Sequence, residues 1–271
     1  MEFLSDDGLR IADRIEARAS VDLYAAAPAA LGLRAEIVNG AAVLIAPKIP
    51  VSYFNRVIGL GVHQPATERD LDALVTRFRG DGVTEYWIHV SPAAQPASLE
   101  SWLAARGFAP PPRRTWAKFL RGPEARHAPA EGLTVRLAEE RDAAALGQLV
   151  CAAFGMPPAL AGWFASLVGR PGWRVFLGEA GGRIVATGSV FIDGTTAWLG
   201  VGATNADYRN RGAQNAMLAA RINAAAAEGC TVLSTETGES IAGEVNPSLN
   251  NIRRAGFVQV CSRLNYAATL R

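Results

Sequence analysis

Residues 203–214, Ala203-Thr-Asn-Ala-Asp-Tyr-Arg209-Asn-Arg211-Gly212-Ala213-Gln214, lie between a predicted strand and a predicted helix. The first backbone N–H groups of a helix lack partners within the helix, so this position favours an anion. The small residues of the stretch leave the backbone open to close approach, and its two arginines add positive charge. No carboxylate follows Asp207 until Glu228. The stretch therefore predicts a turn that binds an anion such as a phosphate.

Strands and helices alternate on both sides of this turn. Apolar periodicity, glycine turns and the helix-stopping Gly229 define the elements. The predicted strands span residues 133–137, 174–180, 183–192, 196–204, 231–235 and 257–266, and the predicted helices span 139–154, 159–168, 209–228 and 247–255. The order βααβββαβαβ predicts an α/β fold, with a mixed and mostly antiparallel sheet flanked by helices.

The first half of the chain follows a similar order. Its predicted elements are a helix at 8–19, strands at 33–38, 41–46 and 53–62, a helix from Thr67, a strand at 84–90, a helix at 98–105 and a strand at 114–120. Both halves end with a strand, a helix, a Gly-Phe pair and a strand, which predicts a diverged duplication. The polar, Pro- and Gly-rich stretch 122–132 marks the boundary, giving domains 1–122 and 132–271.

The corresponding helix start in the first half has the opposite character. Thr67 is a favourable N-cap residue, and Glu68, Asp70 and Asp72 follow it. These carboxylates occupy the end of the helix that attracts anions, and they repel a phosphate. We therefore expect anion binding in the second domain.

The second half resembles the GCN5-related N-acetyltransferase (GNAT) family. The family signature is (Gln/Arg)-x-x-Gly-x-(Gly/Ala), and here it is Arg209-Asn-Arg-Gly212-Ala-Gln214, with Gln214 in place of the small residue. The order of elements and the segment Asn246-Pro-Ser-Leu-Asn-Asn251-Ile-Arg-Arg-Ala-Gly-Phe257 also match. The first half looks like a degenerate copy, so the whole chain resembles tandem-GNAT proteins.

The resemblance implies an N-acetyltransferase that uses acetyl-CoA as co-substrate and no metal. The coenzyme would lie between the fourth and fifth strands, with its pyrophosphate at the anion-binding turn. The implied coenzyme-binding residues are Gly202, Ala203, Thr204, Arg209, Asn210, Arg211, Gly212, Ala213, Gln214, Asn246 and Asn251.

In this family an acceptor amine attacks the thioester carbonyl directly, and many members protonate the leaving thiolate with a Tyr. Here that position is Ile252, which cannot donate a proton. Glu236 is the first candidate for the base and Glu239 the second, because both follow the predicted fifth strand. The alternative is that both are solvated loop carboxylates.

Composition limits the other functions. With 49% apolar and 19% charged residues, the 271-residue chain can build a large core. Its net charge of +2 gives no case for nucleic acid or an anionic membrane. We expect no secretory signal, no membrane span, and reduced thiols at the odd number of three cysteines, as in a cytoplasmic protein.

Some alternatives stay open at this point. The acceptor is expected to be an amine-bearing small molecule or peptide, and an oligomer is possible. The missing Tyr also fits a second interpretation, a non-catalytic acyl-CoA-binding or regulatory protein. A third interpretation is a related acyltransferase with another acyl donor or a hydroxyl acceptor. Trp163, Phe164 and Trp173 belong either to the core or to an acceptor pocket, and residues 53–56 are candidates to face the acceptor.

Overall fold

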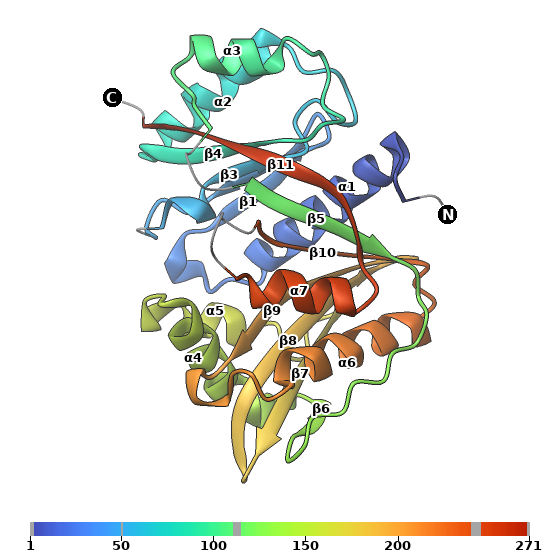
Figure 1. Ribbon diagram of the computed structural model, residues 1–271. Helices are drawn as coiled ribbons and strands as arrows, with labels where there is room; N and C mark the ends of the chain where they lie inside the picture. The colour runs from blue at the N-terminus through green and yellow to red at the C-terminus, as the bar shows by residue number, and fades with distance from the viewer. Residues whose placement is uncertain (1–2, 50, 111–114, 240–244, 270–271) are drawn as a thin grey trace.

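The computed structural model describes residues 3–49, 51–110, 115–239 and 245–269. Its strands are β1 (Arg34–Val38), β2 (Ala41–Ile45), β3 (Arg56–Ile58), β4 (Glu85–Val90), β5 (Thr115–Arg121), β6 (Thr134–Leu137), β7 (Trp173–Ala180), β8 (Arg183–Asp193), β9 (Thr196–Thr204), β10 (Val232–Gly238) and β11 (Val258–Thr269). Within the described residues these strands form one sheet, in the order β1-β2-β3-β4-β11-β5-β10-β9-β8-β7-β6 (Figure 1). This mixed α/β architecture confirms the predicted fold class.

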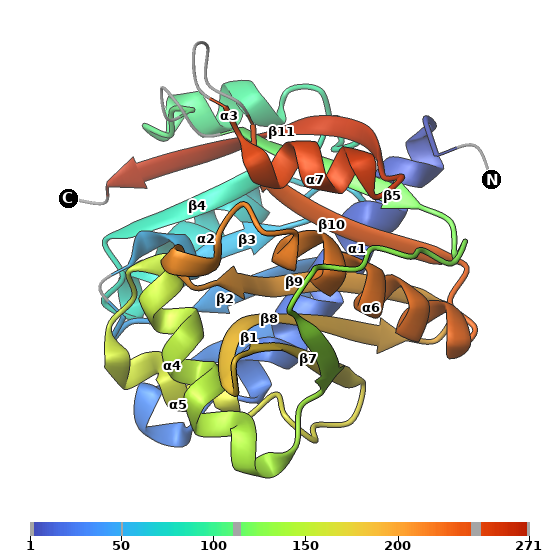
Figure 2. The same ribbon diagram turned by 60° about the horizontal axis from the view of Figure 1, so that its bottom comes forward.

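Helices cover both faces of the sheet (Figure 2). One face of the sheet packs against three helices that share one apolar cluster, namely α1 (Asp6–Ala25), α4 (Ala143–Phe154) and α5 (Ala161–Ala165). Those on the other face are α2 (Glu68–Gly80), α3 (Leu99–Ala105), α6 (Ala213–Ala227) and α7 (Pro247–Arg254). The first face therefore carries helices from both halves in one core, which ties the halves together.

The two halves exchange their last strands at the centre of the sheet. β5, from the first half, lies between β10 and β11, and β11, from the second half, lies between β4 and β5. Lys118 on β5 is consequently opposite Glu236 on β10. The two predicted sheets are thus joined, while the domain boundary at residues 122–132 stays a prediction.

Some predicted elements have different bounds. The predicted helix 209–228 begins only at Ala213, because Asn210 and Gly212 have left-handed backbones with φ of 61° and 81°. The predicted strand 53–62 is reduced to β3, which is preceded by a short 3-10 helix. β10 extends to Gly238, so Glu236 lies within the strand and not beyond its end.

Buried charges meet where the halves join. The Lys118 ammonium lies 2.7 Å from the Glu16 carboxylate and 2.9 Å from that of Glu236. The Arg263 guanidinium pairs with Glu16 and lies 3.2 Å from Asp13. Opposite charges offset the cost of burying each one. We call this group the junction cluster, and it also includes two nearby buried side chains, Arg56 and His89.

The carboxyl of Glu16 shows which effect dominates in this cluster. Burial raises its pKa, but the charges of Arg263 and Lys118 lower it more, so its pKa falls well below the ordinary value of 4.5. Glu16 is therefore ionised at neutral pH, and its charge is part of the folded state.

His89 makes stability depend on pH. Burial, followed by the charges of Arg263 and Arg56, lowers its pKa well below the ordinary value of 6.5. Below this pH the unfolded chain binds a proton that the folded chain does not bind, so the free energy of unfolding falls as pH falls. When the pH falls from roughly 7 to 5.5, we expect the unfolding free energy of the unmodified protein to decrease by about 1 kcal/mol more than that of the His89→Asn variant. Urea unfolding at both pH values measures this difference.

The exposed His127 provides the matched control. His127→Asn makes the same substitution at an exposed position, and its unfolding free energy is measured at the same two pH values for comparison with His89→Asn. Equal slopes for His89→Asn and the unmodified protein would contradict a neutral, buried His89.

The structure also bears on metals and membranes. All three cysteines are free. Across the described ranges, no cluster of three or more His, Cys, Asp or Glu side chains is arranged to hold a metal ion. In the same part of the chain, no helix has both the length and the apolar character needed to cross a membrane.

Candidate active site

The candidate site begins where two parallel strands separate. β9 and β10 pair over three positions, the last being Trp198 opposite Ser234. β9 then continues to Thr204 and β10 to Gly238 without further pairing between them. The Thr235 hydroxyl donates a hydrogen bond of 2.8 Å to the Leu199 carbonyl and closes the narrow end. The backbone of β9 that faces the gap is thus left without a strand partner, as predicted for the fourth and fifth strands.

A bulge distorts β9 beside this gap. The register with β8 shifts between Thr187 and Ser189, so Val201 and Gly202 together lie opposite Gly188. Val201 has φ of 48°, although a β-branched side chain disfavours the left-handed region. Such a backbone costs about 1–3 kcal/mol and persists only where its surroundings enforce it. The bulge changes the direction of the backbone groups beside the gap.

The wide end of the gap meets the start of α6. Gly212 is the N-cap residue, and no side chain of the described residues caps the helix there. The N–H groups of the first turn are therefore free to bind an anion. The left-handed backbone of Gly212 requires glycine, because other residues are strained at its φ of 81°. This local geometry explains why the sequence could identify the turn.

The turn and the gap form one cavity of about 710 Å³. This volume lies within the range of about 300–1,000 Å³ that is usual for small-molecule sites. Among the residues predicted to bind coenzyme, those that line it are Gly202, Ala203, Thr204, Arg209, Asn210, Gly212, Ala213, Gln214 and Asn251.

Two residues of the predicted set lie beside the cavity instead of lining it. The Arg211 guanidinium lies 5.2 Å from the centre of the Tyr208 ring, in a cation–π contact. Asn246 caps α7 by accepting from the Leu249 N–H, and it also donates to the Gly238 carbonyl at 2.5 Å. Asn246 therefore orients α7 beside the cavity.

Gln214, which departs from the family signature, links the two helices of the site. Its Nε2 donates to Ser248 Oγ at 2.9 Å, and its Oε1 accepts from Asn251 Nδ2 at 2.6 Å. The amide thus joins the start of α6 to α7.

Several residues of the cavity were not predicted from the sequence. They include Phe154, Thr187, Asn215, Met217, Arg221, Thr237 and Arg254. The Oδ1 atom of Asn215 is buried and has no hydrogen-bond partner among the described residues. Arg221 is 4% exposed, and burial lowers its pKa to about 10. A lone cation in an alanine-rich helix was the one signal in the sequence that pointed to Arg221.

Glu236 lies at the narrow end of the gap and is not among the residues that line the cavity. Its carboxylate accepts from Lys118 at 2.9 Å and from the Trp198 indole N–H at 3.1 Å. The Trp198 ring lies directly over Gly200, because an added Cβ there would be 1.8 Å from it. Trp198 therefore bridges the two strands and directs Glu236 to the point where they part.

Glu239 is held on the other side of β10. Its carboxylate accepts hydrogen bonds from Thr115, Gln259 and Ser262, on β5 and β11. It does not line the cavity. Its assignment as second candidate base stays a prediction.

Most of the other sequence candidates belong to the interior, and Tyr53 is half-buried. Ile252 is 2% exposed, within the apolar core under α6 and α7. Trp163, Phe164 and Trp173 are buried with α1, as the core interpretation predicted. Tyr53 stacks on Trp116 with ring centres 5.5 Å apart, next to the junction cluster.

The equivalent place in the first half is closed. Thr67 and Asp70 form a reciprocal capping box, with Asp70 N–H to Thr67 Oγ1 at 3.2 Å and Thr67 N–H to Asp70 Oδ2 at 2.8 Å. The backbone of Gln95 bonds to Gly61 and Ala66, at 2.8 and 2.7 Å, and crosses the space beyond β3. The capping box occupies the Thr67 and Asp70 N–H groups and places the Asp70 carboxylate at the helix start, where it repels a phosphate.

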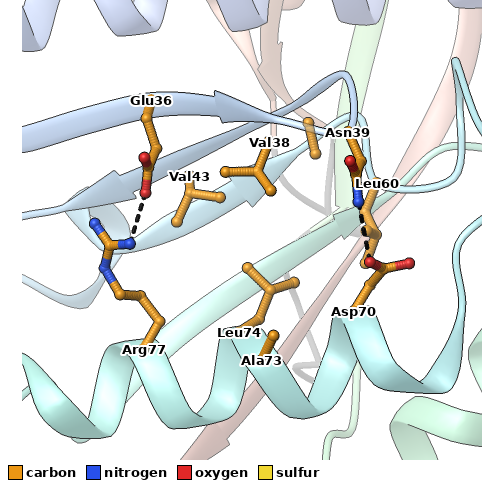
Figure 3. A pocket seen from close by; sticks show the side chains of 10 residues that line it. Glu36, Val38, Asn39, Val43, Leu60, Asp70, Ala73, Leu74 and Arg77 are labelled. Atoms are coloured by element: carbon orange, nitrogen blue, oxygen red, sulfur yellow. Dashed lines mark hydrogen bonds and ion pairs between the residues drawn. The ribbon is translucent and has the colours of Figure 1, made fainter.

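Figure 3 shows a small cavity in the same half, between the β1–β2 hairpin and α2. Arg77 pairs with Glu36 at 2.7 Å on one side, and Asn39 donates to Asp70 at 3.1 Å on the other. Its volume of about 120 Å³ is that of about four water molecules, which excludes a nucleotide coenzyme.

Comparison with known proteins identifies the fold. No family model and no curated protein matches the chain. A GCN5-related N-acetyltransferase from Kribbella flavida is 17% identical, with a TM-score of 0.65 and 95% of each chain covered. A second one, from Sphaerobacter thermophilus, is 18% identical, with a TM-score of 0.62, 85% of this chain and 81% of that one.

A tandem GNAT protein from the clavulanic acid biosynthesis pathway is also similar. It is 17% identical, with a TM-score of 0.59, and the match covers 84% of this chain and 78% of that one. The chain therefore has the fold of the GCN5-related N-acetyltransferases. More particularly, it is similar over most of its length to a tandem member, so the resemblance predicted from the sequence is confirmed at the level of the fold.

Proposed function

We propose that the protein is an acyltransferase that binds acetyl-CoA and transfers the acetyl group to an amine. The observation that carries this proposal is the gap between β9 and β10, which opens onto the uncapped start of α6. A diphosphate fits the free N–H groups of α6 and the Arg209 side chain. An extended pantetheine arm fits the unpaired backbone of β9.

The reaction follows from that placement. The lone pair of the amine attacks the thioester carbonyl carbon, a C–N bond forms and the C–S bond breaks. The amine loses a proton to a base, the leaving thiolate gains one, and the products are an N-acetyl amide and free coenzyme A. Ile252 is apolar and buried, so it cannot supply the proton that reaches the thiolate, and we assign this proton to solvent.

We assign proton acceptance to Glu236, directly or through water, because it lies where the two strands part. Glu236→Gln should lower kcat by about 100-fold. The affinity for acetyl-CoA should stay within about threefold, because the carboxylate lies outside the cavity. The measurements are thiol release with an active amine from a panel, and calorimetry with acetyl-CoA.

Glu239→Gln tests the second candidate base, which lies one residue beyond the end of β10. Thermal unfolding of both variants reports any effect of losing the Lys118 pair. Full turnover by Glu236→Gln over roughly pH 6–9 would remove the assignment.

A second candidate function is an acyl-CoA-binding protein without turnover, which is favoured by the apolar Ile252 at the acid position. Calorimetry and thiol release together separate the two. Binding of acetyl-CoA with thiol release that depends on an amine supports the transferase, whereas binding without release over a broad amine panel supports the binding protein.

A further inference from the structure

Arg221 is a buried cation on α6 whose partners are carbonyl oxygens. Its Nε donates to the Met217 carbonyl at 2.9 Å, one turn back in its own helix. Its Nη1 donates to the carbonyls of Gly200 at 3.2 Å and Ser189 at 3.4 Å, on β9 and β8. Burial lowers the pKa of Arg221, and no carboxylate of the described residues pairs with it. A buried charge without a counter-ion is costly, so its location needs an explanation.

That location is next to the bulge of β9. Ser189 and Gly200 form the last regular pair before the register shifts. Val201, with the left-handed backbone, follows Gly200 directly. The Arg221 hydrogen bonds therefore hold both strands at the point where the backbone leaves its regular path.

Gly188 makes room for the Arg221 guanidinium. A Cβ on Gly188 would lie 2.8 Å from the Arg221 Nε and 2.9 Å from its Cζ. A Cβ on Gly202 would lie 3.6 Å from Nη2, which is an ordinary van der Waals contact, so Gly202 packs against the guanidinium without being required to be glycine. Both glycines are beside the bulge, so the bulge and the guanidinium fit one another.

We propose that Arg221 is a positioning residue that fixes the bulge of β9 and thereby aims the unpaired backbone of β9 at the acyl thioester. This inference rests on the proposed function. It assigns to α6 a role in transfer that is separate from binding the diphosphate. A main-chain donor held at a fixed place polarises a carbonyl more effectively than one that moves.

The test uses acetyl-CoA labelled with ¹³C at the thioester carbonyl. Isotope-edited infrared spectroscopy measures the carbonyl stretch of the bound probe, and calorimetry measures its affinity. In the unmodified protein the band should move to lower wavenumber than in free acetyl-CoA. Arg221→Met should lose about half of that shift or more, while affinity changes by less than about threefold.

Further variants separate positioning from stability. Gly188→Ala keeps Arg221 but displaces its guanidinium, so it should lose the shift as Arg221→Met does. Arg221→Lys should recover part of it. Arg174→Met is the matched control, because Arg174 binds Glu228 at 2.7 Å near the other end of α6, outside the cavity. It should keep the full shift.

The inference is overturned if Arg221→Met or Gly188→Ala keeps the full shift of the carbonyl band. It is also overturned if Arg174→Met loses as much of the shift as Arg221→Met, or if the band of the unmodified protein is not shifted. If Arg221→Met does not fold, Gly188→Ala decides. Failure of the unmodified protein to bind acetyl-CoA contradicts the proposed function itself, and the calorimetry shows this separately.

Discussion

Arg209→Ala combined with Gln214→Glu is expected to weaken acetyl-CoA binding by about 100-fold or more. Arg209 lines the cavity at the turn, so under the proposed function its loss removes a charged partner of the diphosphate. The new carboxylate lies in the first turn of α6, where it takes the favourable end of the helix dipole and repels phosphate. Calorimetry with acetyl-CoA measures the loss.

The substitution at Gln214 is designed to spare the fold. Glutamate has the same shape, still accepts from Asn251, and can accept from the Ser248 hydroxyl. The control is Arg174→Ala with Gln148→Glu, which makes the same charge change at residues outside the cavity. Unchanged affinity in the Arg209 and Gln214 variant would show that the diphosphate does not bind at this turn.

Glu16→Gln is expected to lower the free energy of unfolding by about 3 kcal/mol at pH 7. Glu16 is the carboxylate shared by Lys118 and Arg263 in the junction cluster. Without this negative charge, Lys118 and Arg263 remain buried with fewer opposite charges nearby. The folded state is therefore destabilised more than by the loss of an ion pair at the surface. Urea unfolding monitored by circular dichroism gives the value.

Glu36→Gln is the control, because Glu36 pairs with Arg77 at an exposed position. It should change the unfolding free energy by less than about 0.5 kcal/mol. The pKa of Glu16 is lowered in the folded protein, so its contribution is complete above pH 4.5 and disappears as pH falls through the folded pKa. A difference between the Glu16 variant and the unmodified protein that grows on acidification would contradict the ion pairing.

Local features of the sequence predicted the turn before α6, whereas anion binding at this turn stays a prediction. Gly212 sets the end of the loop by its backbone conformation, and no carboxylate competes in the first turn of α6. Thr67 and Asp70 similarly predicted the closed turn of the first half, which the structure forms as a capping box. These features depend on neighbours within a few residues, so one sequence contains enough information to find them.

The strand exchange depends on contacts that are distant in the chain. β5 has 7 residues and β11 has 12, and no local feature of either strand indicates which of them follows β10 in the sheet. The charged residues Lys118 and Arg263 within these strands indicated a special environment. Their partners are distant in the chain, because both pair with carboxylates of α1 and Lys118 also pairs with Glu236 of β10. Arg221 presents the same difficulty, because its partners are main-chain carbonyls of two strands, which no side-chain pattern marks.

A crystal structure of the protein with acetyl-CoA tests the central claim most directly. We expect the diphosphate at the N–H groups that follow Gly212, next to Arg209, with the pantetheine arm between β9 and β10 beyond Trp198. Coenzyme bound at another surface, with the gap between β9 and β10 left empty at saturating concentration, would contradict the account.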